Sequence, residues 1–181
     1  MKWKREFTMF RYKYIMLALT LLSCDSISTT ARSDKNTLDF DHEIGRPQIR
    51  VTSKGKTQVR ATSLKLLKDN DKDALLVGSV AANFFNDKGE SVSNLSSDSA
   101  WINESADRML ARGNVSVESE NGYVLLSNSI AWDDRYGIIS SKDSVVFFSL
   151  EGDTMYGVGF ESDSDLNRWS IFKPHGVAYK K

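Results

Sequence analysis

An all-β domain behind an N-terminal targeting segment is the organisation that the sequence predicts. From Pro47 onward, apolar residues come in short runs of strand length that recur roughly every ten residues. Serine, asparagine and aspartate are abundant between these runs and often stand beside glycine, as they do in turns. No heptad repeat is visible, and signals for helix ends are scarce. Short strands separated by turns indicate an all-β sandwich or roll.

The first 23 residues have the pattern of a secretory signal. Residues 1–13 hold five basic residues against a single acid, Glu6, and the apolar run Tyr14–Leu22 follows. At about 1.5 Å per residue, a helix over that run covers roughly half of a ~30 Å hydrocarbon core, so it is too short to span a membrane. A basic stretch followed by a short apolar run predicts export. We therefore expect a signal peptide over residues 1–23.

The apolar run ends in Leu21-Leu22-Ser23-Cys24, and Cys24 is the only cysteine in the chain. These residues resemble a bacterial lipobox, in which a small residue precedes a cysteine that is acylated and becomes the new N-terminus. Leu22 departs from the pattern, since a smaller residue more often occupies its position. We expect lipid attachment at Cys24, with acyl chains such as palmitate that hold the protein to a membrane at about 0.8 kcal/mol per buried methylene. The alternative is an uncleaved short anchor with an incidental cysteine.

Residues 24–46 are expected to form a flexible tether between this anchor and a folded domain over residues 47–181. The segment Ser26–Arg46 is polar and carries charges of both signs. Asp25 follows the cysteine directly, an arrangement that favours retention at the inner membrane in lipoproteins of some Gram-negative bacteria. This residue therefore favours the inner membrane as the site of attachment.

The predicted strands follow one another along the domain, each a run of apolar or alternating residues that ends at a turn. They cover Gln58–Leu66, Ala74–Phe85, Met109–Val117, Tyr123–Trp132, Ile138–Ile139, Val145–Leu150, Met155–Phe160 and Ile171–Tyr179. Asn121-Gly122 makes the strongest hairpin turn, because both residues accept positive φ. A short helix over Glu104–Arg112 is the alternative for one segment. A strand is favoured there because Met109 and Ala111 keep a two-residue register into the next hairpin.

A weak internal repeat indicates how these strands stack. Gly78-Ser79-Val80 and Gly113-Asn114-Val115 each lead through a glycine turn to a return strand, a short polar stretch and a tryptophan, Trp101 or Trp132. A repeated hairpin unit buries its apolar face only against its neighbours. The repeat therefore predicts an elongated roll with an exposed edge strand at each end.

The composition argues against nucleic-acid binding and against an enzyme. Lysine plus arginine and aspartate plus glutamate number 24 each, so no net charge attracts nucleic acid. The two histidines, His42 and His175, are far apart, and the acidic run Asp69–Asp73 lacks the glycine and the distal glutamate of a calcium loop. Neither a nucleophile elbow nor a phosphate-binding loop occurs. We therefore expect no catalytic residue, no metal site and no cofactor.

The stretch from Phe84 to Asp163 resembles the periplasmic LptC component of lipopolysaccharide export. The resemblance rests on the order and spacing of short motifs: Phe84–Gly89, Leu95–Ala100, Gly113–Val115, Asn121-Gly122, Leu125–Asp133, Ile138–Ser141 and Gly157–Asp163. Together they cover under half of the chain. The sister component LptA shares the fold and the Gly-Asn-Val rhythm.

The resemblance implies an open β-jellyroll with an apolar groove, in which the acyl chains of lipopolysaccharide lie while the sugars project outward. The protein would lie in the periplasm, lipid-anchored to the inner membrane, and take lipopolysaccharide from an ATP-driven inner-membrane transporter of the ABC class. It would pass the lipid to an LptA-like jellyroll that pairs with its exposed edge strand. A lipidated cysteine would replace the transmembrane helix of the enteric form, so no contact of such a helix with the transporter is carried over.

Candidate groove residues are the larger apolar side chains of the predicted strands: Phe84, Trp101, Leu125, Trp132, Phe147 and Phe160. An open roll leaves room for an apolar ligand, whereas a small closed roll fills its interior, so core packing is the alternative for each of them. An outer-membrane or surface β-sandwich lipoprotein, acting as a binding or structural module, fits the same signal and strands. A groove that is reached through an open edge favours the carrier, and a closed, densely packed sandwich favours this alternative.

Overall fold

All of the regular structure in the described residues is β-strand. The computed structural model describes residues 40–68, 73–103 and 106–176. Its strands are β1 (His42–Gly45), β2 (Gln48–Ser53), β3 (Lys56–Thr62), β4 (Lys65–Lys68), β5 (Ala74–Phe85), β6 (Ser91–Asn103), β7 (Arg108–Ser119), β8 (Val124–Asp133), β9 (Ile138–Phe148), β10 (Thr154–Asp163) and β11 (Trp169–His175). The all-β class predicted from the sequence is confirmed.

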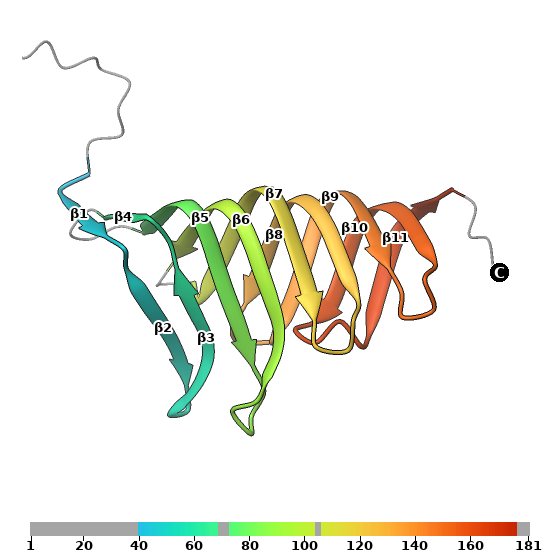
Figure 1. Ribbon diagram of the computed structural model, residues 1–181, viewed down its shortest axis with the longest axis horizontal. Coiled ribbons are helices and arrows are strands. Elements are labelled where there is room, and N and C mark those ends of the chain that lie inside the picture. Colours follow the sequence, from blue (N-terminus) through green and yellow to red (C-terminus); the bar gives the residue numbers. More distant parts are fainter. Residues whose placement is uncertain (1–39, 69–72, 104–105, 177–181) are drawn as a thin grey trace, which may run out of the picture. The chain divides into compact units, whose positions relative to one another are not determined.

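One antiparallel sheet contains every strand, and it does not close on itself. From β5 to β11, each strand pairs with the next one along the chain, so this part of the sheet is a meander of hairpins (Figure 1). β1 and β2 lie at one edge and β11 at the other, and within the described residues these edges do not pair with each other. The expectation of an open jellyroll is therefore confirmed.

The first four strands are two long strands that are each broken once. β4 pairs with the first half of β5, and β3 pairs with its second half. The breaks lie side by side: the Arg46 amide donates to the Leu64 carbonyl at 2.8 Å, and the Leu64 amide donates to the Gly78 carbonyl at 2.9 Å. A line of irregular backbone thus runs from the N-terminal edge into β5.

This line continues through the longer strands as a row of β-bulges, which we call the crease. The ladder shifts register between Val77 and Val80, Ser96 and Ser99, Arg112 and Val115, Ser127 and Ala131, and Val158 and Phe160. These sites lie next to one another across the sheet, since Ser99 is opposite Arg112 and Arg112 is opposite Ser129. A bulge bends its strand and increases its twist, so a row of bulges folds the whole sheet along one line.

Gly113 shows why the crease has its composition. Its φ is 77°, and a Cβ at this position would overlap the carboxylate of Asp98. Asn114 follows with a φ of 48°, and its side-chain amide donates to Asp98 Oδ2 at 2.8 Å. Glycine and asparagine adopt left-handed backbone more readily than other residues. The Gly-Asn pair of the internal repeat is therefore the point at which β7 bends.

The crease divides the sheet into two walls that face each other. The first wall comprises β1, β4 and the halves of the longer strands that adjoin the turns near Ala106, Arg135 and Asp165; the second wall comprises β2, β3 and the other halves. Along each strand, alternate side chains face inward. Buried apolar side chains of both walls form one cluster, so the core lies between the walls.

The folded domain begins before residue 47. β1 lies inside the range 24–46 that we predicted as tether, and it pairs with β4 along its whole length. Glu43 forms an ion pair with Lys65, with 2.7 Å between Oε1 and Nζ, and Ile44 lies opposite Leu66. All residues of β1 are exposed, so the strand has no apolar alternation by which the sequence could reveal it. Residues 24–39 of the predicted tether lie outside the described residues.

Some predicted segments have different limits in the structure. Ile138–Ile139 and Val145–Phe148 belong to one strand, β9, which ends before the predicted limit Leu150, and the stretch Ser97–Ser99, expected to be a polar connection, lies within β6. At both places, serines near the crease interrupt the apolar pattern without ending the strand. Arg108–Arg112 is strand, as preferred over the helical alternative.

Candidate functional site

The space between the two walls is the candidate site, because the largest buried apolar side chains meet there. Five of the six candidate groove residues face it and are at most 4% exposed: Phe84, Leu125, Trp132, Phe147 and Phe160. At these positions the interior is filled by the chain's own side chains. Their burial is that of core residues, and their contact with a lipid stays a prediction.

Trp101 is the exception, because it lies on the outer face of β6. Its neighbour Ala100 is the buried residue, and the Trp101 indole Nε1 donates to Asp73 Oδ2 at 2.7 Å. Strict alternation from the buried Leu95 would have turned Trp101 inward. The bulge between Ser96 and Ser99 inserts extra residues and reverses the alternation. The assignment of Trp101 to the groove is therefore corrected.

Aromatic rings from opposite walls contact each other across the interior. Phe84 of the second wall and Trp132 of the first meet edge to face, with ring centroids 5.6 Å apart. Nearer the C-terminal edge, the Phe147 ring lies 5.3 Å from Phe160 and 4.7 Å from Trp169. Such pairs contribute about 0.5–1.5 kcal/mol beyond their buried area. These contacts hold the walls together without any charge or directional polar bond.

Two members of this aromatic group were not predicted from the sequence. Tyr123 stacks on Phe147 with ring centroids 5.7 Å apart, and Trp169 opens β11. Trp169 precedes the strand start that we expected at Ile171, and Tyr123 adjoins the strongest hairpin turn. Bulky aromatic residues next to turns were the signal that would have found them.

One polar atom of the interior has no partner. Trp132 Nε1 is the single buried side-chain nitrogen or oxygen in the described part of the chain for which no hydrogen bond is found. Leaving a buried donor unpaired costs about 1–3 kcal/mol. The residues opposite Trp132 on the neighbouring strands, Met109 and Ile139, are buried and apolar, and Ser162 on the next strand is a buried polar residue. The inward side of the first wall around Trp132 is thus mainly apolar, which suits hydrocarbon better than a polar substrate.

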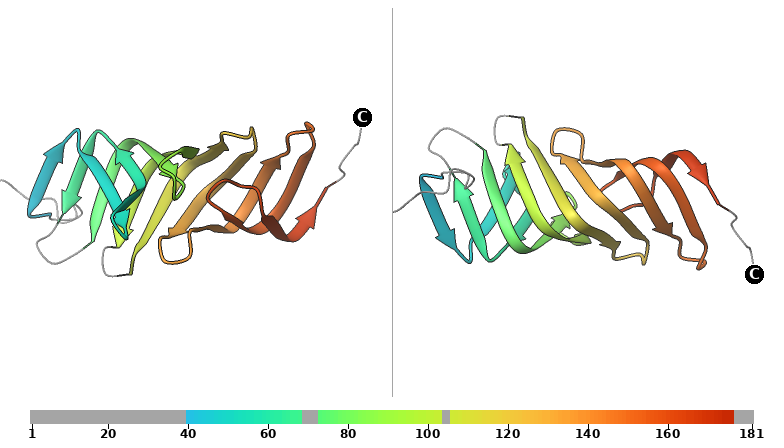
Figure 2. Two further views of the ribbon diagram at one scale, coloured as in Figure 1. Left: turned by 90° about the horizontal axis from the view of Figure 1, so that it is seen from below. Right: turned by 90° about the horizontal axis from the view of Figure 1, so that it is seen from above.

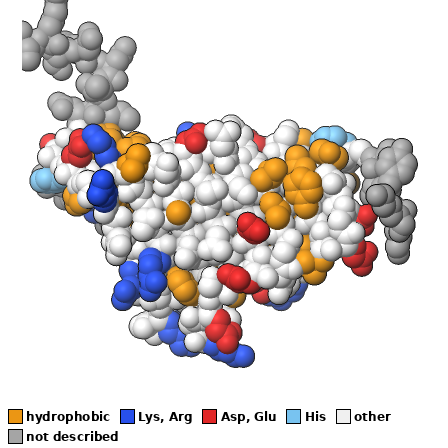
Figure 3. All heavy atoms as spheres, in the orientation of Figure 1, with side chains coloured by type: hydrophobic (Ala, Val, Ile, Leu, Met, Phe, Trp, Pro, Cys, Tyr) orange, Lys and Arg blue, Asp and Glu red, His pale blue; other side chains and the backbone are white. Residues whose placement is uncertain are grey.

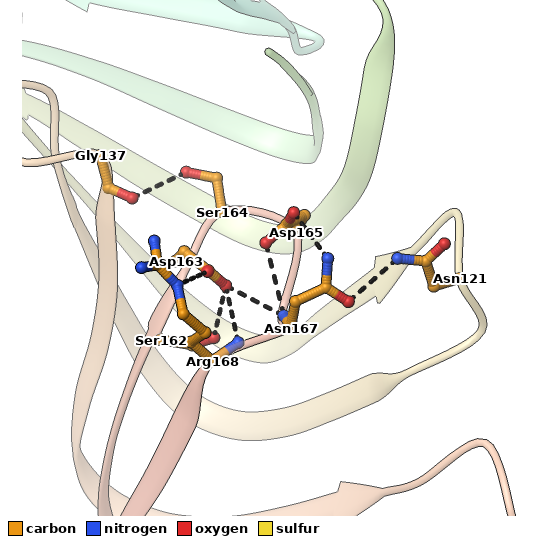
Figure 4. A network of polar contacts seen from close by, with 8 residues as sticks. All are labelled: Asn121, Gly137, Ser162, Asp163, Ser164, Asp165, Asn167 and Arg168. Atoms are coloured by element: carbon orange, nitrogen blue, oxygen red, sulfur yellow. Dashed lines mark hydrogen bonds and ion pairs between the residues drawn. The ribbon is translucent and has the colours of Figure 1, made fainter.

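The side opposite the crease is the mouth, where the turns of the two walls approach each other. The loop between β10 and β11, dark red in Figure 2, folds back toward the earlier strands there. The Ser93 hydroxyl of β6 donates to the Ser164 carbonyl of this loop, and the Asn121 side-chain amide donates to Asn167 Oδ1 at 3.0 Å (Figure 4). Ser164 Oγ also donates to the Gly137 carbonyl at 3.1 Å. The loop therefore bridges the mouth from the first wall to the second.

The same loop is braced internally by two carboxylates. Asp163 accepts hydrogen bonds from the backbone amides of Asn167 and Arg168 at 2.9 and 3.1 Å and from Arg168 Nε at 2.9 Å. Burial raises the pKa of Asp163, but hydrogen bonds from Asp165, Arg168 and the two amides outweigh it and leave the pKa below its ordinary value. Burial and the neighbouring Asp163 raise the pKa of Asp165. The loop thus keeps its shape through contacts within itself and with Asp163 at the end of β10.

The outer face of the first wall carries a shallow depression that is lined in part by charged side chains. It has a volume of about 680 Å³ and is lined by side chains of both signs, among them Arg108, Lys142 and Glu161. At its rim, the Asp133 carboxylate binds Arg108 Nε at 2.7 Å and Arg135 Nη2 at 3.0 Å. Hydrogen bonds from Arg135 and then Arg108 lower the pKa of Asp133 to about 2. This surface therefore combines charged side chains with apolar ones such as Leu110 and Ile138.

An apolar surface lies at the C-terminal end of the sheet. Tyr156, Val158 and Phe172 are exposed on β10 and β11, Phe172 by 62%. Figure 3 shows hydrophobic side chains gathered at that end. Among the described strands none pairs with the free side of β11, so this surface and edge together can receive another protein.

Two negative findings hold for the part of the chain that the structure describes. It contains no helix long and apolar enough to cross a membrane, and no group of three or more histidine, cysteine or acidic side chains placed to hold a metal ion. Cys24 and the expected signal lie outside the described residues.

A family model described as LptC: Lipopolysaccharide-assembly, LptC-related matches residues 15–173, which include nearly the whole sheet. The chain belongs to the LptC family. Proteins of this family are transport components of the lipopolysaccharide export system, tied to the inner membrane and facing the periplasm. A comparison with curated proteins found no match. Membership in the LptC family supports a role in lipopolysaccharide transport for this chain.

Proposed function

We propose that this chain carries lipopolysaccharide across the periplasm, with the acyl chains held between the two walls. The observation that carries the proposal is an inward face that is mainly apolar from β3 to β11, on a sheet whose two edges do not pair with each other within the described residues. Removing hydrocarbon from water contributes about 25 cal/mol per Å². An acyl chain between the walls would contact mainly apolar side chains, whereas the depression on the outer face mixes charged side chains with apolar ones.

Because the interior is filled, a lipid enters by parting the walls. Across the interior the walls meet through apolar contacts such as Phe84 against Trp132. Such contacts are non-directional, so an acyl chain that lies between the two rings replaces the apolar contact that each ring loses with the other. The crease remains intact as the line about which the walls turn, since its backbone hydrogen bonds run along the sheet and not across the interior.

The two edges of the sheet supply the partners' docking sites. The lipid arrives from the inner-membrane ABC transporter and leaves to an LptA-like jellyroll that extends the sheet by strand pairing. The β11 edge suits the second role, because exposed Val158 and Phe172 flank it. Pro174 lacks an N–H, so β11 offers a partner strand no backbone donor at that residue.

The membrane attachment that we propose is acylation at Cys24, with the domain held at the periplasmic face of the inner membrane. A basic stretch, a short apolar run and a single cysteine at its end support this attachment. Two or more acyl chains give stable anchoring where one chain gives only reversible binding.

The alternative is a surface or outer-membrane lipoprotein that serves as a binding or structural module. It predicts a packed interior, which this domain has. It also predicts a closed sandwich, whereas this sheet is open at both edges. The open sheet and the LptC family membership favour the carrier.

Site-specific photo-crosslinking in cells tests the proposed function. Para-benzoylphenylalanine at Phe147 or Trp132 should label with lipopolysaccharide, because both side chains face the interior. Trp101 is the matched control, since it is an aromatic residue of the same sheet on the outer face. Labelling at the inward positions without labelling at Trp101 supports the proposal. Absence of lipopolysaccharide adducts at both inward positions, or equal labelling at Trp101, contradicts it.

A further inference from the structure

The loop that bridges the mouth contains one apolar residue, and that residue is buried. Leu166 has no exposed surface, although its neighbours Asp165, Asn167 and Arg168 are polar. Its φ is 58°, a left-handed conformation that a leucine rarely adopts. Left-handed residues are common in hairpin loops, where glycine, asparagine or aspartate usually supplies them. Here a leucine adopts this conformation, and its alkyl side chain is buried in the interior.

The side chain of Leu166 belongs to the buried apolar cluster between the walls, and we call the position that it fills the seat. The two strands joined by its loop carry Phe160 and Trp169, whose rings both contact Phe147. Because the loop also reaches Ser93 on the opposite wall, it covers part of the interior from the mouth side. The seat is thus an apolar position at the mouth that is taken by a side chain of the loop.

The bonds that hold the loop to its surroundings differ from those that hold its shape. Its links to the rest of the sheet, through Ser93, Gly137 and Asn121, are hydrogen bonds between neutral groups, which water can replace. The charged bonds, from Arg168 and two amides, join the loop to Asp163 at the end of its own strand β10 and do not cross the mouth (Figure 4). The loop can therefore leave the mouth as a unit without leaving a charge unpaired.

We propose that this loop, residues 164–168, is a plug, and that the seat of Leu166 is a binding site for one hydrocarbon chain of the transported lipid. The plug and the chain compete for the seat: Leu166 fills it in the empty protein, and an entering alkyl chain expels Leu166 and breaks the bridges to Ser93 and Asn121. The proposal rests on the proposed function, since it assigns a position within the same interior.

A reversible lock on the plug gives the test. In the full-length protein in isolated membranes, Asn121→Cys with Asn167→Cys places two thiols where the side chains now bond, and a short bis-methanethiosulfonate reagent joins them. With para-benzoylphenylalanine at Phe147, the locked protein should give severalfold fewer lipopolysaccharide adducts than the unlocked one. Reductant should restore them. Each single-cysteine variant, treated with the same reagent, is the control.

A second variant separates a plug from a residue that only packs the core. Leu166→Ala vacates the seat and should increase the adduct yield at Phe147, whereas a purely structural leucine would give a less stable protein with unchanged or lower yield. If Leu166→Ala proves too unstable, Asn121→Ala with Asn167→Ala removes one bridge at the surface and should raise the yield in the same direction. Equal labelling of locked and unlocked protein overturns the plug.

The outcomes also distinguish the plug from the proposed function. Adducts in both locked and unlocked protein overturn the plug and leave the carrier function standing. No adduct even in the unlocked protein overturns the carrier function. Binding of cis-parinaric acid to the purified full-length protein then tests the seat independently of lipopolysaccharide. Weaker binding to the locked protein than to the unlocked one supports a hydrocarbon site at the seat. Equal binding to both forms overturns it.

Discussion

Phe84 and Trp132 come from opposite walls of one folded sheet and meet edge to face, with ring centroids 5.6 Å apart. Both are almost fully buried, and they lie in β5 and β8, which do not pair with each other. The contact exists because the sheet folds along the crease, which brings the inward sides of the two walls opposite each other. It marks the place where the walls must part if a ligand is to lie between them.

Phe84→Ala should destabilise the domain by about 3–5 kcal/mol, the usual cost of truncating a buried phenylalanine. The loss combines the transfer of the ring with a cavity beside Trp132. Phe172→Ala is the control, because Phe172 is largely exposed, and its expected effect is within about 0.5 kcal/mol. Urea denaturation followed by tryptophan fluorescence measures both. A change below about 1 kcal/mol for Phe84→Ala would show that the walls do not depend on this contact.

Gly113→Ala should destabilise the crease more than Gly137→Ala does. Both glycines have positive φ, 77° and 62°, so both substitutions introduce backbone strain of roughly 1–2 kcal/mol. Only at Gly113 does the new Cβ also overlap Asp98, whereas nothing lies within 4 Å at Gly137. The double variant with Asp98→Ala should recover part of the difference. Equal unfolding free energies for the two alanine variants would contradict the packing described for the crease.

The pKa of Asp133 gives a prediction for acid. Its folded-state pKa of about 2 lies below the ordinary value of 3.8, so its contribution to stability is present above pH 3.8 and is lost as the pH falls toward 2. Arg135→Gln should raise this pKa toward 3.8, and Arg168→Gln, which removes a partner of Asp163, should not. Carbon-13 NMR titration of the aspartate carboxyl groups measures both. An unchanged Asp133 titration in Arg135→Gln would show that the guanidinium does not act on it.

Cys24→Ser should abolish incorporation of labelled palmitate and release the protein from the membrane fraction, because the chain has no other cysteine to acylate. Ser23→Thr is a control that leaves the cysteine in place. Metabolic labelling and fractionation of cells measure both properties. Continued palmitate incorporation in Cys24→Ser would contradict the anchor.

The tryptophans Trp101 and Trp132 show how far sequence reasoning reaches in this fold. Apolar alternation located the strands. The side of the sheet on which a side chain lies, however, is counted from a residue known to be buried, and any inserted residue between the two changes the result. At Trp101 the bulge between Ser96 and Ser99 reverses that count. The bulge is made of polar residues with no pattern of their own, and only its pairing with β7 reveals it. Trp132 faces the interior, because no bulge separates it from the buried Ile130 two residues before it.

Leu166 and β1 were beyond sequence reasoning for a different reason. Leu166 is a single apolar residue in a polar loop, which a sequence pattern treats as an exposed turn. Its burial depends on the distant partners Ser93 and Asn121. β1 is exposed along its length and forms only because β4 offers an unpaired edge. Both depend on contacts between segments far apart in the chain, which periodicity does not encode.

Spin labels across the mouth test most directly whether the packed walls part to take a lipid. Lys88 and Tyr136 lie in the turns that follow the strands of Phe84 and Trp132, one turn on each wall. With Lys88→Cys and Tyr136→Cys labelled in the purified full-length protein, pulsed dipolar spectroscopy should show a longer distance once lipopolysaccharide is bound. Lys88 with Glu151→Cys, both on the second wall, should show no change. Lipopolysaccharide that binds while the Lys88–Tyr136 distance stays the same would contradict a ligand between the walls.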